Sequence, residues 1–345
     1  MAGNLQKKML EAIESELQRQ AGRLDQPRTR QFHEMLAYHM GWTGEGAGAQ
    51  AAGKRIRPLL LLLSLVSAHG GESGREDYVN WLHAIPVAAS VELIHNFSLV
   101  HDDIQDNSEL RRGRKTVWVK WGAPMAINVG DALFVIANQA ALDLQDHFPA
   151  PMVVRAARIL NDCCLELTKG QFLDMSYEDR SDLAIGDYMP MVSGKTSALL
   201  SACTQVGALL GYAQGEAVEC FRLFGYHLGF AFQVQDDILG IWGDEAVTGK
   251  SAASDLVEGK NSLPVLYGLE KNGRFARRWR EGPIAPAEVK EVASMLEDEG
   301  GKNFAEEVSE EETRKALDFL DKANPQGEAG EVLLGLANLL LKRNQ

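Results

Sequence analysis

Cysteine is scarce in this chain, and its spacing excludes two common uses. The 345 residues include only Cys163, Cys164, Cys203 and Cys220. Adjacent cysteines do not readily bridge each other, and no metal-type CxxC spacing occurs. Neither a disulfide framework nor a structural zinc site is therefore expected. Free thiols in a reducing cytosol are the simplest interpretation.

Long apolar runs are also missing. The longest purely apolar stretch is LLLLL at 59–63, and even PLLLLLSLV is too short to cross a bilayer, which takes about 20 residues. The start of the chain is amphipathic and carries charges of both signs, so it lacks the apolar core of a secretory signal. We expect a cytoplasmic protein without an integral membrane segment, although its substrate could be lipid-like.

Positive charge is in the minority. Lys and Arg number 35 against 48 Asp and Glu, which gives a net charge of −13. A general nucleic-acid binder needs a basic surface, so this class is excluded. A local basic pocket for phosphate groups remains compatible with the composition. Apolar residues make up 45%, which is ordinary for a globular protein.

Strand-like alternation is scarce as well, whereas apolar residues recur at three- and four-residue spacing through most of the chain. This periodicity predicts an all-α protein. The expected helices are 3–22, 27–40, 55–69, 80–106, 123–145, 150–175, 195–212, 215–241, 262–270, 286–299, 305–323 and 327–342. The Gly/Ala-rich segment 41–53 is expected to be a flexible loop, and 242–262 a long polar one. No linker or repeat is visible, so a single domain over 1–345 is predicted.

Two aspartate clusters are the most informative feature that is present. HDDIQD contains Asp102, Asp103 and Asp106, and QDDILG contains Asp236 and Asp237. Each follows an apolar, helix-patterned run. Asp102 and Asp106 lie four residues apart, and like charges so placed destabilise a helix by about 0.2–0.5 kcal/mol. An acidic cluster at the end of a buried helix therefore suggests a bound cation. Either cluster alone could be a solvated helix end, but two with similar apolar runs before them argue against this. Hard oxygen ligands without Cys or His suit Mg²⁺, which often binds one or two carboxylates together with substrate phosphates.

Basic residues flank the same helices. They are Lys54, Arg55 and Arg57 in GKRIRP, Arg111, Arg112 and Arg114 in RRGRK, Lys195 in GKTS, and Lys250 and Lys260 in the long polar loop. Any one of them alone would be interpreted as a solvated surface charge. Together with the acidic clusters they favour a phosphate-rich ligand held by Mg²⁺ and by guanidinium groups, which bind phosphate bidentately.

These motifs, taken in order, resemble a known family. GKRIRP, HDDIQDNSELRRGRKTVW, GKTSAL, FQVQDDILGIWGD and GK…GKNS are similar to the motifs of the trans-isoprenyl diphosphate synthases, or polyprenyl synthetases, over residues 50–270. The geranylgeranyl diphosphate synthases are the most similar branch. The resemblance implies an all-α isoprenoid synthase fold, a single helical bundle around a central apolar cavity, and a homodimer. It also implies a prenyltransferase that ionises an allylic diphosphate and couples it to isopentenyl diphosphate.

The resemblance assigns roles to single residues. Three Mg²⁺ ions would be held by Asp102, Asp103, Asp106 and Asp236, with Asp237 in support. The allylic diphosphate would contact Arg111, Lys195, Lys250 and Lys260. Isopentenyl diphosphate would contact Lys54, Arg57, His95 and Arg112. Thr196 and Gln233 would lie near the allylic cation, whose formation is helped by charges that stabilise the leaving diphosphate.

Some of these residues have an alternative structural role. His95 on an apolar helix could be a packed core residue, but it lies seven residues before Asp102, about two turns away on the same face. Gln171 and Asp174 in GQFLD match a family pattern at the cavity, and a hydrogen-bonded helix pair is an equally good interpretation.

The sequence departs from the family at two places. The second cluster usually reads DDxxD, but its last position here is Gly240. Activity is still expected, with Asp244 and Asp255 as residues that could support the metal or nearby lysines. Lys115 stands where the family commonly has proline, and we expect little consequence from this change.

Residues before the first cluster predict the chain length of the product. Ser98, Phe97 and Ile94 lie four, five and eight residues before Asp102. In the family an aromatic residue at this place forms a floor, although simple core packing would also explain Phe97. A small residue at the fourth position with an aromatic at the fifth resembles synthases that make the C20 product geranylgeranyl diphosphate. A farnesyl (C15) or longer-chain synthase is the alternative.

Two other functions share features with this sequence. A class I terpene cyclase also uses DDxxD and Mg²⁺, but it needs no isopentenyl diphosphate pocket, so Lys54, Arg57, His95 and Arg112 argue against it. A non-catalytic subunit of a heteromeric synthase would explain Gly240. The other aspartates and Lys195 argue against that function.

Overall fold

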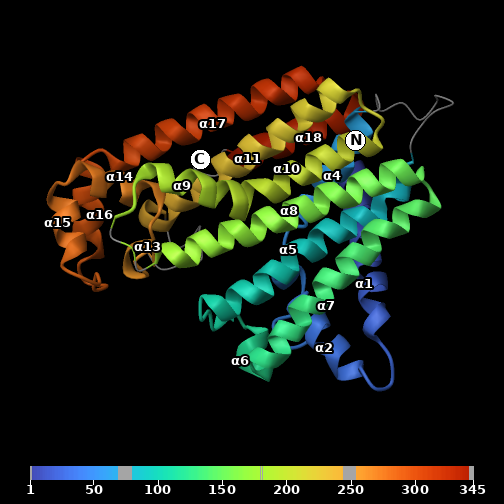
Figure 1. Ribbon diagram of the computed structural model, residues 1–345, viewed down its shortest axis with the longest axis horizontal. Helices are drawn as coiled ribbons and strands as arrows, with labels where there is room; N and C mark the ends of the chain where they lie inside the picture. Colours follow the sequence, from blue (N-terminus) through green and yellow to red (C-terminus); the bar gives the residue numbers. More distant parts are fainter. Residues whose placement is uncertain (1, 69–79, 179, 181, 244–253, 342–345) are drawn as a thin grey trace. The chain divides into compact units, whose positions relative to one another are not determined.

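A computed structural model describes residues 2–68, 80–178, 180, 182–243 and 254–341, and this part of the chain is almost entirely helical (Figure 1). The all-α prediction is confirmed. In chain order the helices are α1 (Ala2–Ala21), α2 (Arg30–His39), α3 (Ala49–Ala52), α4 (Ile56–Ala68), α5 (Ile85–Gln105), α6 (Val117–Trp121), α7 (Ala123–Leu142), α8 (Ala150–Tyr177), α9 (Ile185–Val192), α10 (Ala198–Leu210), α11 (Gly215–Trp242), α13 (Ser254–Val257), α14 (Leu263–Lys271), α15 (Arg274–Arg280), α16 (Val289–Asp298), α17 (Gly301–Ala323) and α18 (Gly327–Leu341).

Short elements complete the described part. They are the 3₁₀ turns η1 (Gly22–Leu24), η2 (Trp81–Ala84) and η3 (Asp143–Asp146), the π-helical turn η4 (Ser193–Ser197), and an antiparallel hairpin of β1 (Leu110–Arg111) and β2 (Arg114–Lys115). The chain forms two compact units. Unit 1 comprises 1–164, 202–222 and 322–334, and unit 2 comprises 165–201, 223–321 and 335–345.

Unit 1 is built around α5. This helix packs along α7 and against α1 and α4 (Figure 1). Ser90 of α5 donates a 2.7 Å hydrogen bond to the carbonyl of Ala137 in α7. The leucines of α4 are buried on all sides, which explains why its sequence is a continuous apolar run and not an amphipathic one. The first acidic cluster lies at the C-terminal end of α5.

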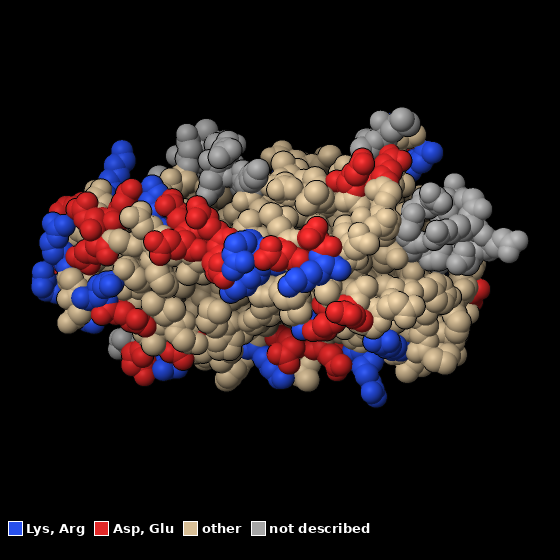
Figure 2. All heavy atoms as spheres, turned by 90° about the horizontal axis from the view of Figure 1, so that it is seen from above, with Lys and Arg blue, Asp and Glu red and all other residues tan. Residues whose placement is uncertain are grey.

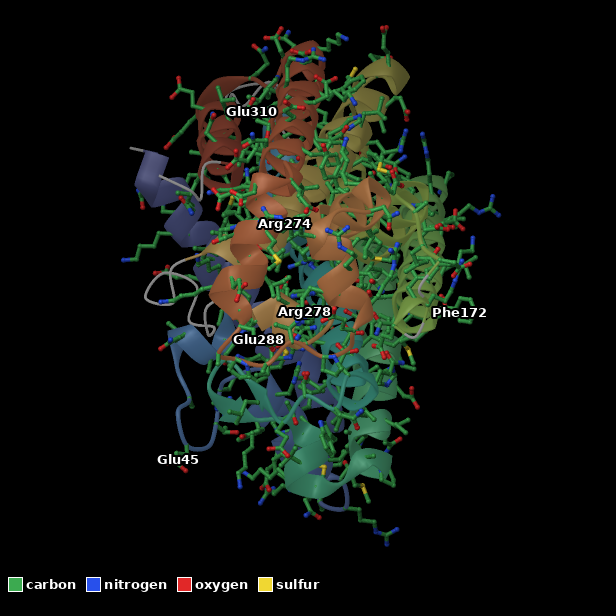
Figure 3. All side chains as sticks on the ribbon, turned by 90° about the vertical axis from the view of Figure 1, so that its left-hand side faces the viewer. Glu45, Phe172, Arg274, Arg278, Glu288 and Glu310 are labelled. Atoms are coloured by element: carbon green, nitrogen blue, oxygen red, sulfur yellow. The ribbon has the colours of Figure 1, made fainter. Side chains whose placement is uncertain are left out.

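Unit 2 contains two apolar clusters around the C-terminal half of α11. In one, Phe230 and Val234 of α11 pack with Tyr188 of α9 and Leu263 of α14. In the other, Ile241 packs with residues of α15 and α16. Arg278 of α15 donates to Glu288, which immediately precedes α16, at 2.9 Å (Figure 3). The second acidic cluster lies on α11 between these two apolar groups.

The surface carries charges of both signs. Figure 2 shows acidic and basic side chains intermixed on one face. On α17, Arg314 pairs with Glu311 and Asp318 at 2.8 and 3.0 Å. Exposed pairs of this kind add little stability. No broad basic patch is visible on that face, in agreement with the negative net charge.

One segment passes a simple test for a membrane span. By length and composition, Ala123–Asp146, which is α7 with η3, could cross a bilayer, and 44% of its most apolar window is buried in the structure. The core helix of a globular protein passes the same test, and α7 packs along α5 in unit 1.

The main helices lie where their periodicity predicted them, and the short elements were missed. The hairpin at 110–115, α6, α9 and α15 were not expected. The segment 41–53 was expected to be a flexible loop, but it contains α3 and is tied to the rest of unit 1 by hydrogen bonds. Within the predicted polar loop at 242–262, residues 244–253 lie outside the described residues, and the rest contains the end of α11 and the short helix α13.

Candidate active site

The first acidic cluster lies at the end of α5. Asp102 and Asp103 are in its last turn, and the Asp106 amide closes the helix with a 2.8 Å bond to the Asp102 carbonyl. Carboxylates at a helix C-terminus face the negative end of the helix dipole, which is unfavourable without a compensating cation. A cation bound at this cluster would offset that unfavourable interaction.

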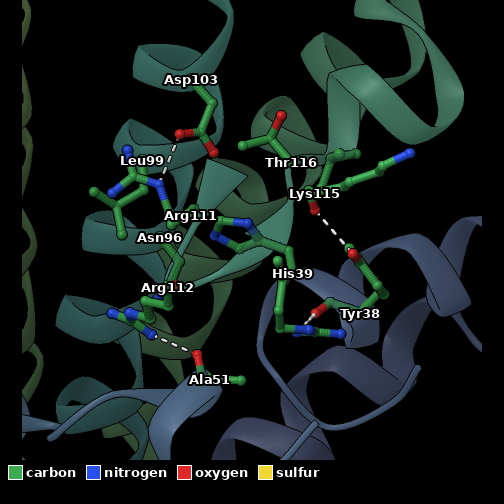
Figure 4. A pocket seen from close by; sticks show the side chains of 12 residues that line it. Tyr38, His39, Ala51, Asn96, Leu99, Asp103, Arg111, Arg112, Lys115 and Thr116 are labelled. Carbon is green, nitrogen blue, oxygen red and sulfur yellow. Dashed lines mark hydrogen bonds and ion pairs between the residues drawn. The ribbon is translucent and has the colours of Figure 1, made fainter. Parts of the chain in front are cut away.

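Asp103 is the buried member of the cluster. Its side chain is 2% exposed, and Arg111 Nε donates to its Oδ1 at 2.7 Å (Figure 4). Burial raises the pKa of Asp103 to about 6, although Arg111 acts in the opposite direction. Its buried Oδ2 has no hydrogen-bond partner among the described residues. One oxygen is thus held by arginine and the other is available to a ligand.

The hairpin places Arg111 and Arg112 in different surroundings. Arg111 contacts Asp103, whereas Arg112 donates to the carbonyl of Ala51 at 2.7 Å. A Cβ at Gly53 would lie 2.7 Å from the Arg112 guanidinium, and Gly53 has a φ of +89°. Glycine is therefore required there, because any side chain would displace Arg112. Arg112 is held directly beside the GKRIRP motif.

The GKRIRP residues divide into two kinds. Lys54 is exposed and Arg57 is half-buried. Arg55 is buried and forms ion pairs with Glu92 at 2.9 Å and Glu14 at 3.1 Å. Arg55 is therefore structural, and Lys54 and Arg57 are the members of this motif that suit a ligand.

His95 lies on α5, seven residues before Asp102. Burial, followed by the positive charges of Arg57 and Arg112, keeps the pKa of His95 well below its usual value. The positive charges of both arginines therefore disfavour protonation of the His95 ring. A neutral imidazole of this kind can donate one hydrogen bond to a diphosphate without adding charge. Arg57 and Arg112 are two of the three residues that the resemblance groups with His95.

A small cavity lies behind these arginines, and Figure 4 shows its lining. Asp103, Arg111, Arg112 and Asn96 surround it together with His39. Its volume is about 20 Å³, which is room for about one water molecule. It is too small for a substrate.

His39 is a residue that sequence reasoning missed. Burial, followed by the charges of Arg111 and Arg112, lowers the pKa of His39 to about 3. A neutral side chain there avoids adding a third positive charge to the arginine pair. Its sequence context, the last turn of an ordinary amphipathic helix, gave no signal of this position.

The predicted chain-length residues lie on α5 before the cluster. Phe97 is 8% exposed, and its ring meets Phe134 of α7 edge-on at 5.2 Å between centroids. Ile94 is buried, and Ser98 is half-buried with its hydroxyl donating to the His95 carbonyl at 2.8 Å. The aromatic residue is thus braced by a neighbouring helix, whereas Ser98 is small and partly open.

The second acidic cluster, in unit 2, has a buried member as well. Asp237 is 6% exposed and accepts hydrogen bonds from Tyr188 Oη at 2.7 Å, Leu263 N at 3.0 Å and Gln233 Nε2 at 2.9 Å. Burial raises the pKa of Asp237 to about 6 against these donors. Asp236 is half-buried. Asp237 is thus held in place by three protein donors.

Gln233 and Thr196 extend this network. Thr196 Oγ1 donates to Gln233 Oε1 at 2.8 Å, and Gln233 then donates to Asp237. Two predicted residues and the second cluster therefore form one chain of hydrogen bonds. The Gln233 amide is oriented by contacts at both ends.

Lys195 lies on the π-helical turn η4, an irregularity that often marks functional sites. Its Nζ forms an ion pair with Asp174 of α8. A Cβ at Gly170 would lie 2.1 Å from the Lys195 amide nitrogen, so glycine permits the close approach of α8 to η4. The hydrogen-bonded interpretation of Asp174 is supported, and its partner is a predicted site residue.

The tertiary structure explains why position 240 is glycine. A Cβ at this position would lie 2.0 Å from Asp255 Oδ2, so the carboxylate of Asp255 occupies the space that a side chain would need. Asp255 is buried and lies 3.6 Å from Lys260 Nζ. A carboxylate from α13 therefore lies where a side chain at position 240 would begin. Lys250 and Asp244 lie outside the described residues.

The donor set suits Mg²⁺. Both clusters offer carboxylate oxygens, and Asp103 Oδ2 is a buried oxygen without a protein partner in the described part. No group of three or more His, Cys, Asp or Glu side chains there forms a complete cage for a metal. Mg²⁺ does not require one, because it usually combines one or two carboxylates with water and substrate phosphates.

Comparisons with known proteins agree on one family. The polyprenyl synthetase family model matches residues 47–296. The (2E,6E)-farnesyl diphosphate synthase of Mycobacterium tuberculosis is 36% identical over 343 residues, covering 96% of this chain and 91% of the relative. The geranylgeranyl diphosphate synthase of the same organism is 36% identical over 316 residues, covering 90% and 86%.

A solved structure gives the same result. Geranylgeranyl pyrophosphate synthetase from Pyrococcus horikoshii superimposes with a TM-score of 0.86 at 31% identity, covering 99% of this chain and 98% of that chain. Members of this family are Mg²⁺-dependent prenyltransferases that use isopentenyl diphosphate and allylic diphosphates. With both acidic clusters and the basic motifs in place, this chain belongs to the polyprenyl synthetase family, as a short-chain trans-isoprenyl diphosphate synthase.

Proposed function

We propose that the enzyme extends an allylic diphosphate with isopentenyl diphosphate and stops at the C20 product, geranylgeranyl diphosphate. The observation that carries this proposal is the buried Phe97 ring, braced by Phe134. At 1.5 Å per residue, Phe97 lies about 7.5 Å below Asp102 along α5. Ser98, one residue nearer, is too small to stop the chain earlier. Both farnesyl and geranylgeranyl synthases occur among relatives at 36% identity, so C15 is the second candidate.

Two substitutions test the chain-length assignment. Phe97→Ala should lengthen the product because it removes the floor, and Ser98→Phe should shorten it because it raises the floor. Phe148→Ala is a matched control, because Phe148 is also a buried phenylalanine of unit 1. Chromatography of the dephosphorylated products measures the outcome. One product length for the wild type and both α5 variants would remove the basis of the C20 assignment.

The substrate contacts are proposed as the resemblance assigns them. Lys54, Arg57, His95 and Arg112 would hold isopentenyl diphosphate, and the allylic diphosphate would contact Arg111, Lys195, Lys250 and Lys260. Three Mg²⁺ ions, held through the carboxylates of both clusters, would neutralise charge on the leaving diphosphate. Lys195 would exchange Asp174 for a phosphate oxygen when substrate binds. The positive charges of Arg57 and Arg112, which help to lower the pKa of His95, support this division.

Arg57→Ala tests whether Arg57 contacts isopentenyl diphosphate and not the allylic diphosphate. Losing one charge-assisted contact should cost roughly 1.5–3 kcal/mol in binding. We expect KM for isopentenyl diphosphate to rise about tenfold or more, with KM for the allylic substrate nearly unchanged. Equal effects on both constants would contradict the division of contacts.

We further propose a cytoplasmic homodimer in which 1–345 works as a single domain. Exposed apolar side chains recur on one face of α7 at Ile127, Val135 and Leu142. A similar stripe follows α8 through Val154, Leu165 and Phe172, of which Phe172 is 69% exposed (Figure 3). Such stripes favour burial against a second copy. The family model runs through both units, which supports one functional domain.

Sedimentation measures the oligomeric state. The wild type should sediment as a dimer, and Val135→Glu should shift it toward monomer because a charge would enter the apolar stripe. Leu82→Glu is the control, because Leu82 is equally exposed but lies on η2, outside both stripes. A wild type that is monomeric at micromolar concentration would contradict the dimer proposal.

A further inference from the structure

Arg114 contacts the loop that precedes the basic GKRIRP motif. Its guanidinium donates three hydrogen bonds to backbone carbonyls, at 2.8 Å to Tyr38, 2.6 Å to Thr43 and 2.9 Å to Glu45. The same group lies 4.1 Å from the centre of the Tyr38 ring. Two of these carbonyls belong to the loop and one to the last turn of α2, and donating to all three uses the planar geometry that distinguishes arginine from lysine.

The loop is shaped to receive this guanidinium. Gly48 N bonds to the Gly41 carbonyl at 3.0 Å, so the loop closes on itself. Gly44 has a φ of +85°, and a Cβ there would lie 2.7 Å from the Tyr38 ring. A side chain at Gly44 would therefore push apart the surfaces that Arg114 joins. This is a built contact and not a chance surface interaction.

The hairpin holds the loop at a second point. Tyr38 Oη donates to the carbonyl of Lys115 at 2.8 Å, and Arg112 donates to the carbonyl of Ala51 at 2.7 Å (Figure 4). Residues 110–115 and 38–53 are thus joined near both ends of the loop. Lys54 and Arg57 follow immediately, so their backbone begins where the loop is fixed.

We propose that Arg114 is a positioning residue for isopentenyl diphosphate. It fixes the 41–53 loop against the hairpin, so that Arg112 and the GKRIRP side chains are arranged before the substrate arrives. Preorganisation of this kind lowers the cost of binding, because the loop is not ordered at the expense of binding energy. The inference rests on the proposed contacts of Lys54, Arg57 and Arg112 with isopentenyl diphosphate.

Hydrogen exchange and steady-state kinetics test this proposal together. The variants are Arg114→Ala and Arg114→Lys in the full-length enzyme, with Arg30→Ala as the control. Arg30 is an exposed cation of unit 1 whose nearest acidic partner, Asp25, is 3.9 Å away. Arg57→Ala is measured in parallel as a direct contact.

We expect both Arg114 variants to exchange amide protons faster within 41–53 than the wild type and the control. We also expect KM for isopentenyl diphosphate to rise roughly tenfold to a hundredfold, the scale of effect that slight misplacement can cause. KM for the allylic diphosphate should stay within about twofold. Lysine should not rescue, because it keeps the charge but cannot bond three carbonyls in one plane.

The failures are distinguishable. Unchanged amide exchange within 41–53 in Arg114→Ala, or wild-type behaviour of Arg114→Lys, would show that Arg114 does not fix the loop against the hairpin. Faster exchange with both KM values unchanged would overturn the positioning role. If Arg57→Ala and Arg114→Ala both raise KM for the allylic substrate instead, the assignment of substrates under the proposed function is overturned, and with it the role given to Arg114.

Discussion

The first and second acidic clusters share a plan but differ in what holds them. In each, the second aspartate is buried with its pKa raised to about 6, and the first is more exposed. Asp103 is held by one charged partner, Arg111, whereas Asp237 is held by three uncharged donors. The first cluster is therefore paired with a partly exposed arginine, and the second is held in a buried hydrogen-bond network. The two clusters have similar sequences but different surroundings. Asp103 keeps one oxygen without a partner in the described part of the chain, and Asp237 is held by three donors.

The first aspartate of each cluster, which is half-buried, should matter most for turnover. Asp102→Ala and Asp236→Ala should each reduce kcat by roughly 10²–10³-fold or more, because each removes charge that stabilises the leaving diphosphate. Circular dichroism should show both variants folded. Turnover near the wild-type value in either folded variant would show that its cluster does not serve the metal.

Removal of the two buried carboxylates should lower the stability of the protein by different amounts. Asp237→Ala leaves three donors of unit 2 without their acceptor and should lower the free energy of unfolding by about 3 kcal/mol or more. Asp103→Ala frees Arg111, which is 31% exposed and can turn to water, so the loss should be about 1 kcal/mol. Thermal melts without Mg²⁺ measure both. Equal losses would erase the contrast drawn between the clusters.

The smallest effect concerns the glycine that distinguishes the second cluster. Gly240→Ala should destabilise by about 1–2 kcal/mol, because its Cβ would collide with the buried Asp255 carboxylate. Asp255→Ala should remove that collision, so the double variant should be less destabilised than the two single losses predict. Additive melting shifts would indicate that the two residues do not share this space.

Sequence periodicity predicted the long helices because each buries a face or a whole surface at regular spacing. α4, α5 and α11 are of this kind, and each acidic cluster was correctly placed near a helix end. The hairpin that carries Arg111 and Arg114 was missed, because two-residue strands give no periodic signal. α9 was missed because it is short and contains Pro190.

The partners of the charged residues could not be predicted from the sequence. Arg55 and Arg114 lie in basic motifs beside Lys54 and Arg112, yet Arg55 pairs with glutamates and Arg114 with backbone carbonyls. The contact between Gly240 and Asp255 joins residues fifteen positions apart through a tertiary fold. Residue type and spacing identified the chemistry, whereas the tertiary contacts decide which charges remain for the substrate.

The most direct test of the central claim is a product analysis with the wild-type enzyme. The purified protein is incubated with Mg²⁺ and labelled farnesyl diphosphate, with and without isopentenyl diphosphate, and the dephosphorylated products are separated. We predict geranylgeraniol as the main product, formed only when isopentenyl diphosphate and Mg²⁺ are both present. A hydrocarbon from farnesyl diphosphate alone would indicate a cyclase. Farnesyl diphosphate recovered without extension would contradict the C20 assignment.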